Sequence, residues 1–555
     1  MQKTVNIYYK PNSEYRRYPI GTTVLEILND INPADKDLIV SAKVNGKSED
    51  LNFAVYKPKD IEFVRLTSSS GMRVYVRTLC IVLSKALYDL FPKAQLFVEH
   101  PLSKGYYCSI KRLGRELTPE IIAAIKQRMD ELIASNLPVI RHEEQYTRVV
   151  ELFHKRKMYD KLALLESLQR PYNEYFELDG YIDYYNGALL PYTGMLRLFD
   201  LEPIYDGLLL RLPSGKNPTV LEEMVPQFKM YEIFKEHIEW NNIMGVSNVG
   251  EFNRACKARK SFDLIKIAEA LHEKKIAGIA DRIINDLDTL RFVMVSGPSS
   301  SGKTTFSKRL SIQLMAAGVK PIIVSLDNYF VDRDKTPRDK NGEYDYECIE
   351  ALDIDFFNKQ LTQLLAGEEV SLPSFNFETG KRMFRGKKAR LGPRSIVLME
   401  GIHALNPSLT PTLPEETKFK IYVSALTSIA FDNHNWIPTT DNRLLRRIIR
   451  DNRYRGYSAQ ETIARWASVR AGEDKWIFPF QENADVMFNS ALIFELGILK
   501  KYADPILAEV PRNSDEFSEA HRLLKFLNYF ASIPDREIPP TSLLREFLGG
   551  SSFKY

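Results

Sequence analysis

The chain has 555 residues, 44% hydrophobic and 27% charged, which is ordinary globular composition and too long for one hydrophobic core. Lys plus Arg number 76 against 72 Asp plus Glu, so the net charge gives no case for nucleic-acid or membrane binding. The four cysteines lack Cys-x-x-Cys spacing, which argues against disulfides and a cysteine-rich zinc site. The sequence has no signal-peptide pattern and no apolar run near the ~18 residues that span a bilayer. We therefore expect several domains in a soluble, cytoplasmic protein with no membrane partner.

Residues 1–66 alternate short β-like runs with one helix-like stretch at residues 23–29, which predicts a small mixed α/β module. The text PIGTTVLEILNDI…SAKVNGKSEDLNFAVYKPKDIEFV resembles a TGS domain, the ubiquitin-like module found in threonyl-tRNA synthetases and some regulatory GTPases. The resemblance implies a ubiquitin-like TGS domain over residues 1–66.

Residues 67–215 continue as the amino-terminal half of threonyl-tRNA synthetases does, with VYVRTLCIVLSKALYDLF followed by AQLFVEHPLSKGYYCSI. The resemblance implies an α+β editing module whose metal-type ligands are a His-x-x-x-His and a Cys-x-x-x-His. The aligned positions here are Arg77, Ile81, Tyr185 and Leu189. None of these side chains supplies a neutral imidazole or a thiolate. We therefore expect a degenerate editing module, retained as a scaffold or binding surface and carrying no zinc.

The histidines that remain in this region, His100, His142 and His154, are not at ligand spacing for one another, so a structural role is favoured for them. Residues 216–288 are rich in helical patterning and predict a helical connector with no assigned chemistry.

Residues 292–305, FVMVSGPSSSGKTT, join an apolar run to a glycine-rich loop and then to a helix-like pattern. Gly297 and Gly302 bracket four residues and precede Lys303 and Thr304, which is the spacing of a phosphate loop. Backbone N–H groups of such a loop surround nucleotide phosphates, while the lysine reaches the β- and γ-phosphates and the threonine hydroxyl ligates Mg²⁺. A chance glycine-rich turn is disfavoured by the strand before it and the helix after it. The expected cofactors are ATP and Mg²⁺, bound by Gly297, Ser299, Ser300, Ser301, Gly302, Lys303, Thr304 and Thr305.

Two further buried-strand patterns end in an acid: residues 320–327 end at Asp327, and residues 395–400 end at Glu400. Ligands of open α/β sheets gather at the carboxyl ends of the strands, so both acids are expected beside the phosphate loop. Glu400 is placed to hold Mg²⁺ directly or through water. For Asp327 two interpretations stay open on spacing alone: a proton acceptor or metal-side acid, and a cap of the following turn.

The stretch DNRLLRRIIRDNRYRG, read as a helix, places Arg443, Arg447 and Arg450 on one face. Such a face is usually a solvated basic surface. In a phosphoryl-transfer enzyme it also serves as a lid that neutralises the transferring charge.

Seven elements in order across residues 290–490 resemble the uridine kinase and phosphoribulokinase group, nearest to uridine/cytidine kinases: GPSSSGKTT, SLDNYF, YDYECIEALD, LPSFNFETGKR, VLMEGIHAL, DNRLLRRIIRDNRYRG and ADVMFNSAL. The resemblance implies a P-loop nucleoside kinase domain with a mostly parallel sheet over residues 289–490, followed by a helical extension over residues 491–555. The whole chain is expected to be an α/β multidomain protein.

The same resemblance implies roles for individual residues. Asp327 would be the catalytic base, assisted by Lys303 and Arg450, while Thr304 and Glu400 would serve the metal. The implied substrate residues are Asp345, which would hold the sugar hydroxyls, and Phe375, Arg382, Arg447 and Arg455.

Several positions depart from the family pattern. Phe375 and Gly380 stand where the family has a base-recognising tyrosine and histidine, and Tyr457 and Arg465 replace a later arginine and glutamine. The insert ALTSIAFDNHNWIPTT before the arginine-rich stretch is longer than usual. Phosphoryl transfer is therefore better supported than pyrimidine recognition.

The leading hypothesis is an ATP-dependent kinase for the 5′-hydroxyl of a ribonucleoside, with uridine or cytidine as the expected small-molecule substrate. The alternative is an RNA- or ribosome-associated regulatory NTP-binding protein. An RNA contact through the amino-terminal domains and a homo-oligomer both stay open.

Overall fold

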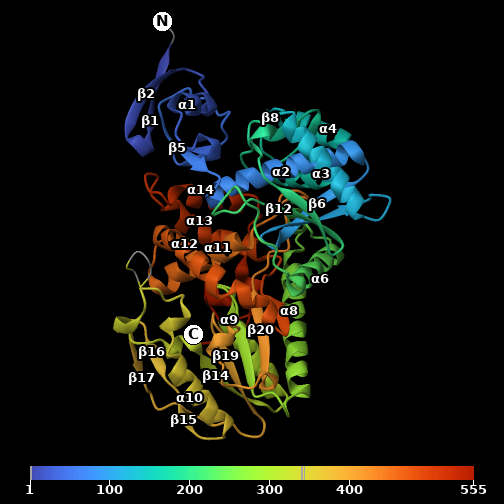
Figure 1. Ribbon diagram of the computed structural model, residues 1–555. Coiled ribbons are helices and arrows are strands. Elements are labelled where there is room, and N and C mark those ends of the chain that lie inside the picture. Colours follow the sequence, from blue (N-terminus) through green and yellow to red (C-terminus); the bar gives the residue numbers. More distant parts are fainter. Residues whose placement is uncertain (1–2, 339–341, 343, 555) are drawn as a thin grey trace.

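The computed structural model describes residues 3–338, 342 and 344–554. Figure 1 shows three levels: two amino-terminal α/β regions at the top, a group of helices from the second half of the chain in the middle, and a parallel sheet at the bottom. The chain is an α/β multidomain protein, as expected. Among the described residues, no helix combines the length and the apolar character needed to cross a bilayer.

The first region is one mixed sheet crossed by a single helix. Its elements are β1 (Thr4–Tyr9), β2 (Glu14–Pro19), α1 (Val24–Ile31), β3 (Ile39–Val44), β4 (Lys47–Glu49) and β5 (Lys59–Arg65). The strand order is β2-β1-β5-β3-β4, with β1 antiparallel to β2 and parallel to β5. Thr23 and Glu26 form a capping box that fixes the start of α1, which buries Val24, Ile27 and Leu28 against the sheet.

The second region contains four helices and two small antiparallel sheets. The helices are α2 (Ser69–Leu90), α3 (Pro119–Ala134), α4 (Tyr146–Arg156) and α5 (Tyr159–Leu168). One sheet has the order β10-β9-β8, from Tyr181–Asp183, Tyr172–Leu178 and Val139–Gln145. The other has the order β11-β12-β7-β6, from Asp200–Ile204, Gly207–Arg211, Gly105–Lys111 and Gln95–Leu102. Helix α2 is buried along much of its length because both its neighbouring helix and the sheets cover it.

Three helices lead from this region to the parallel sheet: α6 (Phe228–Met244), α7 (Val249–Lys257) and α8 (Ser261–Asn285). Helix α8 runs down one side of the molecule in Figure 1. Its apolar residues join those of α9 (Lys303–Ala316) in covering one face of the sheet. The three helices lie within residues 216–288, for which the sequence predicts a helical connector.

The parallel sheet has the order β14-β19-β13-β20-β21, and every pair of neighbouring strands is parallel. Its strands are β13 (Phe292–Ser296), β14 (Lys320–Ser325), β19 (Ser395–Glu400), β20 (Lys418–Ser424) and β21 (Val486–Asn489). Helix α10 (Ile354–Leu365) covers the face opposite α9. A sheet covered on both faces requires apolar residues on both, which explains the unbroken apolar runs of β13 and β19. Two short hairpin pairs lie beyond α10: β15 (Val370–Ser371) with β18 (Lys388–Ala389), and β16 (Ser374–Asn376) with β17 (Lys381–Met383).

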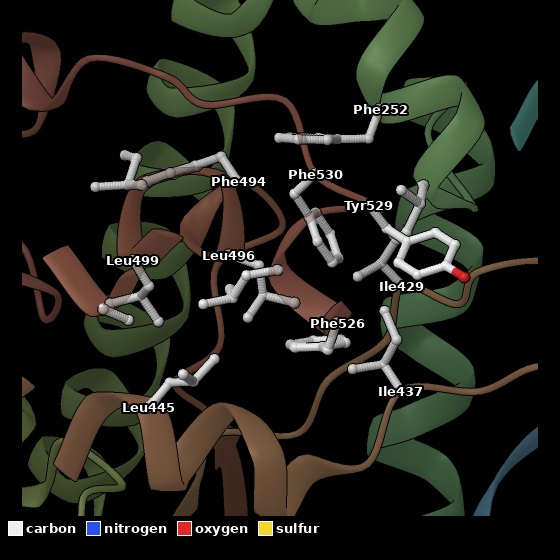
Figure 2. Packing of buried hydrophobic residues seen from close by; sticks show 14 of the residues in the cluster. Phe252, Ile429, Ile437, Leu445, Phe494, Leu496, Leu499, Phe526, Tyr529 and Phe530 are labelled. Atoms are coloured by element: carbon white, nitrogen blue, oxygen red, sulfur yellow. The ribbon is translucent and has the colours of Figure 1, made fainter. Parts of the chain in front are cut away.

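The middle level is a single apolar core built from distant parts of the chain. Its helices include α11 (Thr439–Arg455), α12 (Ala459–Trp476), α13 (Glu495–Ala508), α14 (Phe517–Leu527) and α15 (Arg545–Leu548). Figure 2 shows Phe252 of α7, Ile429 and Ile437 of the insert, Leu496 of α13 and Phe526 of α14 as members of one cluster of buried side chains. The insert over residues 424–440 therefore lies inside a shared core.

Candidate active site

The phosphate loop connects β13 to α9 in a conformation that requires its glycines. Gly297 has φ +157°, and a Cβ there would lie 1.9 Å from the carbonyl oxygen of Val423. Gly302, at the start of α9, has φ +84°, and Ser300 also has a positive φ of 59°. The backbone is thus held close to neighbouring strands while the start of α9 faces the site, which suits an anion.

Glu400 ends β19 beside this loop. Its Oε1 lies 3.4 Å from the hydroxyl oxygen of Thr304 and 3.1 Å from that of Ser325. Burial, together with the negative charge of Asp327, raises the pKa of Glu400 to about 7. Carboxylate and hydroxyl oxygens are the ligands that Mg²⁺ prefers, so Thr304 and Glu400 fit a Mg²⁺ shared with nucleotide phosphates. Within the described ranges, no three or more His, Cys, Asp or Glu side chains gather as a metal cage.

Asp327 lies in the 3₁₀ turn Leu326–Tyr329 that follows β14. Its side chain reaches solvent, yet the surrounding protein displaces enough water to raise its pKa, an effect that the charges of Lys303, Arg455 and Arg450 oppose. Among the described residues, no donor forms a hydrogen bond with its carboxylate, so it does not cap the turn. This leaves Asp327 available to accept a proton.

Lys303 lies in the first turn of α9, and its Nζ donates to the carbonyl oxygen of Pro298 at 3.1 Å. Burial lowers the pKa of Lys303, while the charges of Glu400, Asp327 and Glu546 act in the opposite direction. The structure therefore brings together the lysine and the two strand-end acids that the sequence predicts.

Helix α11 turns its arginines toward the phosphate loop. Arg443 Nε donates to the carbonyl oxygen of Ser299 at 3.0 Å, and Arg447 Nη1 donates to the Ser299 hydroxyl at 2.9 Å. Arg443 is 1% exposed, so the interpretation of this face as a solvated basic surface is wrong for Arg443. Its side chain is shielded because α12 and the phosphate loop cover it.

Asp451 forms ion pairs with three arginines of α11. Its carboxylate lies 3.2 Å from Arg447 Nε, 3.0 Å from Arg450 Nη2 and 3.2 Å from Arg455 Nη1. One buried carboxylate therefore organises three guanidinium groups, and the charges of two of them, Arg450 and Arg455, act on Asp327.

Two acids near the loop carried no signal in the sequence. Glu473 of α12 accepts the Ser299 N–H at 3.0 Å, forms an ion pair with Arg443, and lies 2.9 Å from Arg470. Glu347 packs against Gly472 of α12, where a Cβ would lie 2.6 Å from that of Glu347. Burial raises the pKa of Glu347 to about 7, against the opposing charge of Arg447. Only the tertiary packing of α12 reveals these residues.

The expected substrate residues differ in how far other protein groups already engage their side chains. Asp345 Oδ1 accepts the backbone N–H groups of Glu347 and Cys348 at 3.0 and 3.2 Å, so this oxygen shapes its own loop. Arg382 lies 2.9 Å from Asp353 Oδ2 and also donates to the carbonyl oxygens of Tyr329 and Phe330. These contacts give Arg382 a structural role in joining β17 to the turn that carries Asp327.

Phe375 is 9% exposed and contacts Phe330 and Phe377 edge to face. Its ring thus belongs mainly to an aromatic cluster. Gly380 has φ +66° in the β16–β17 turn, where a Cβ would lie 2.6 Å from that of Arg333. The turn therefore requires glycine at this position.

The positions aligned with the editing ligands do come together. Ile81, Tyr185 and Leu189 lie in one buried apolar cluster. Arg77 packs against Gly187, where a Cβ would lie 2.8 Å from its Nη1. Burial lowers the pKa of Arg77 to about 10. Among the histidines of this region, His100 stacks on Phe234, with ring centroids 3.9 Å apart. This packing is the structural role expected for His100.

Comparisons with known proteins divide the chain in two. Residues 292–493 match the model of the Phosphoribulokinase / Uridine kinase family. The amino-terminal region is similar to threonyl-tRNA ligases. Identity is 30% over 205 residues with Threonine--tRNA ligase 2 of Bacillus subtilis (strain 168), covering 37% of this chain and 32% of that protein. It is 29% over 194 residues with the enzyme of Syntrophomonas wolfei, covering 35% and 30%. The chain spans about a third of the length of these relatives.

Two solved structures also align with this chain. One is a candidate fructose transport system kinase from Silicibacter sp. TM1040, at 20% identity and TM-score 0.28, covering 38% of this chain and 98% of that one. The other is a candidate uridine kinase from Bacillus stearothermophilus, at 22% identity and TM-score 0.27, covering 39% and 98%.

The all-parallel sheet, its phosphate loop and the strand-end acids define a P-loop kinase domain. Residues 292–493 of this domain match the Phosphoribulokinase / Uridine kinase family, and a region similar to threonyl-tRNA ligases precedes them.

Proposed function

We propose that this chain is an ATP-dependent kinase that transfers the γ-phosphoryl group to the 5′-hydroxyl of a ribonucleoside, with uridine or cytidine as the leading substrates. The observation that carries the proposal is the meeting of Lys303, Asp327 and Glu400 at the carboxyl ends of β13, β14 and β19. Such a site positions an acceptor, a phosphate and a metal side by side.

Each side chain has a chemical task in this proposal. Asp327 accepts the proton of the attacking hydroxyl, because its carboxylate is free of hydrogen bonds within the described residues and reaches solvent. Lys303 and the arginines of α11 surround the transferring charge. Thr304 and Glu400 hold Mg²⁺, which supplies charge neutralisation at the phosphates when it is bound. Asp345 retains Oδ2 as an acceptor for a sugar hydroxyl.

The direct test is phosphate transfer from ATP in the presence of Mg²⁺, with each ribonucleoside offered separately and the product identified as a 5′-monophosphate. Formation of uridine or cytidine monophosphate supports the proposal. A folded protein that binds ATP but transfers phosphate to none of the nucleosides contradicts it.

The alternative function is an RNA-associated regulatory protein that uses the P-loop domain as a switch. The similarity of the amino-terminal region to threonyl-tRNA ligases favours it. ATP hydrolysis measured with nucleoside alone and with tRNA alone separates the two functions. Stimulation by tRNA without phosphate transfer to any nucleoside would support the switch.

A further inference from the structure

Helix α15 and the residues beside it lie against the first turn of α9. The backbone N–H and the hydroxyl group of Thr305 both donate to Glu546 Oε2, at 3.3 and 2.6 Å. Leu543 approaches Gly302, where a Cβ would lie 3.3 Å from its Cδ2. Lys308 Nζ donates to the carbonyl oxygen of Lys554. Residues 542–554 therefore cover one side of the phosphate loop, and a carboxylate sits on the donors of that loop.

The donors that Glu546 occupies are those that a nucleotide needs. In a phosphate loop, N–H groups at the start of the helix surround the α- and β-phosphates, and the helix dipole favours an anion there. Thr305 follows Thr304 in this first turn. A phosphate and the carboxylate of Glu546 compete for the same N–H group, and their negative charges repel each other at that distance.

The charge of Glu546 also acts on the cations of the loop. It stabilises the charged forms of Lys303 and Lys308, and so opposes the lowering of their pKa by burial. Two positive charges that would attract a triphosphate are thus partly neutralised by a side chain of the same molecule.

We propose that Glu546 is an internal competitor of the nucleotide, so that nucleoside triphosphate binding requires its carboxylate to leave Thr305. This inference rests on the proposed function, because it takes the loop to bind a nucleotide. It makes Glu546 a residue that sets nucleotide affinity.

The movement is confined to one side chain. Leu543, Leu544, Phe547 and Leu548 are at most 2% exposed and anchor the backbone on both sides of Glu546. Glu546 itself is half-buried, and within the part of the chain that the structure describes its carboxylate accepts hydrogen bonds from the N–H and hydroxyl groups of Thr305. Rotation of the Glu546 side chain toward solvent therefore releases the donors while the apolar anchor stays in place.

The test compares the wild-type chain with Glu546→Gln, which keeps the shape of the side chain and removes its charge. Glu537→Gln is the matched control, because Glu537 lies exposed nine residues earlier on the same segment. Equilibrium binding of Mg²⁺-ATP and Mg²⁺-ADP is measured without any nucleoside. We expect Kd to fall about threefold to thirtyfold in Glu546→Gln, the range of a charge at a helix N-terminus, and to stay unchanged in Glu537→Gln. The gain in nucleotide affinity should shrink at high salt, since it arises from removing the charge repulsion between Glu546 and the phosphates.

A folded Glu546→Gln protein whose Kd for both nucleotides equals or exceeds the wild-type value overturns the inference. If Glu546→Gln does not fold, Glu546→Ala is measured in the same way and must also bind more tightly. Failure of the proposed function has a different signature: folded wild-type and Glu537→Gln proteins bind neither ATP nor ADP. That result would show that the loop does not bind a nucleotide, and it would overturn the inference as well.

Discussion

Lys161 of α5 and Asp432 of the insert that precedes α11 lie 3.5 Å apart, from Nζ to Oδ1, and both side chains are buried. Asp160 and Asp183 lie 3.3 and 3.2 Å from the same Nζ, and His434 Nδ1 lies 2.6 Å from Asp183. The insert that leads into the arginine helix is thus fixed to the threonyl-tRNA-ligase-like region by buried charges. The amino-terminal region therefore takes part in positioning α11.

The first prediction concerns this buried network. Lys161→Met removes the cation that faces three carboxylates and leaves them uncompensated, so we expect a loss of about 3–5 kcal/mol in unfolding free energy. Denaturant unfolding measures the loss. Lys155→Met is the control, since Lys155 is exposed in the last turn of α4. Equal stability of the two variants would show that the network contributes nothing.

The second prediction concerns proton transfer. Asp327→Asn keeps the shape of the side chain but cannot accept the proton, so kcat should fall by ~10²–10⁴ while the Kd for ATP stays near its wild-type value. Asp334→Asn, an exposed neighbour, should leave both unchanged. Lys303→Ala should instead weaken ATP binding and turnover together. Near-normal kcat in Asp327→Asn would remove the proposed role of Asp327.

The third prediction concerns pH. Burial and the charge of Asp327 raise the pKa of Glu400 from 4.5 to about 7. Because this folded-state pKa exceeds the unfolded value, the folded protein holds more protons between these pH values, so this group's contribution to stability falls as pH rises from 4.5 to about 7. Binding Mg²⁺ at Glu400 requires the carboxylate, so Mg²⁺-ATP binding near pH 7 should release a proton.

Calorimetry in buffers of different ionisation enthalpy measures that proton release. Glu400→Gln cannot titrate and should bind Mg²⁺-ATP with less proton release than the wild-type protein. The remaining release would come from other groups such as Glu347, whose pKa burial also raises to about 7. Identical proton release from both proteins would show that Glu400 is already ionised or does not hold the metal.

The fourth prediction concerns the threonyl-tRNA-ligase-like region. Arg77, Ile81, Tyr185 and Leu189 supply no imidazole or thiolate, so the purified protein should hold no stoichiometric zinc in this region and should not hydrolyse mischarged threonine-type tRNA. Elemental analysis and a deacylation assay check this. One tightly held zinc per chain, lost on substituting Tyr185, would contradict the prediction.

Local patterns in the sequence were sufficient to predict the phosphate loop and its two strand-end acids. The run from Phe292 to Thr305 contains its own strand, turn and helix start, and Asp327 and Glu400 follow apolar runs whose parallel pairing brings them to the loop. The seating of Glu546 on Thr305 has no local pattern, since 241 residues separate them. Sequence reasoning also left Arg443 on a solvated face as one interpretation, because helical periodicity cannot show that α12 covers it.

The insert shows the same limit. Its length is visible in the sequence, but its burial depends on partners more than 200 residues away, such as Lys161. A short polar stretch with Asp, Asn and His has the composition of a surface loop. Its burial becomes apparent only when the structure shows the buried lysine that pairs with its aspartate.

The last prediction concerns the acceptor base. A site that hydrogen-bonds a base rejects a wrong base strongly, because the wrong base leaves buried polar groups unpaired. A site that contacts the base only through apolar side chains discriminates by only ~1–3 kcal/mol. Phe375 has no hydroxyl and lies mostly within its aromatic cluster, Gly380 has no side chain, and the Arg465 guanidinium rests 4.6 Å from the centre of the Tyr457 ring. We therefore expect kcat/KM to vary by about tenfold to a hundredfold across ribonucleosides, which is the range that such contacts give.

If Asp345 Oδ2 accepts a sugar hydroxyl, as we propose, 2′-deoxyribonucleosides should be used less well than their ribose counterparts. A panel of ribo- and deoxyribonucleosides with Mg²⁺-ATP, run on the wild-type protein and on Arg465→Ala, measures both effects. If the Arg465 guanidinium instead leaves the Tyr457 ring and donates to the base, kcat/KM of the wild-type protein should vary across ribonucleosides by more than the expected range. The Arg465→Ala variant should then lose that discrimination. A sharp preference for uridine that survives Arg465→Ala and Tyr457→Phe would contradict the prediction, because the base would then be read by hydrogen-bonding groups elsewhere in the site.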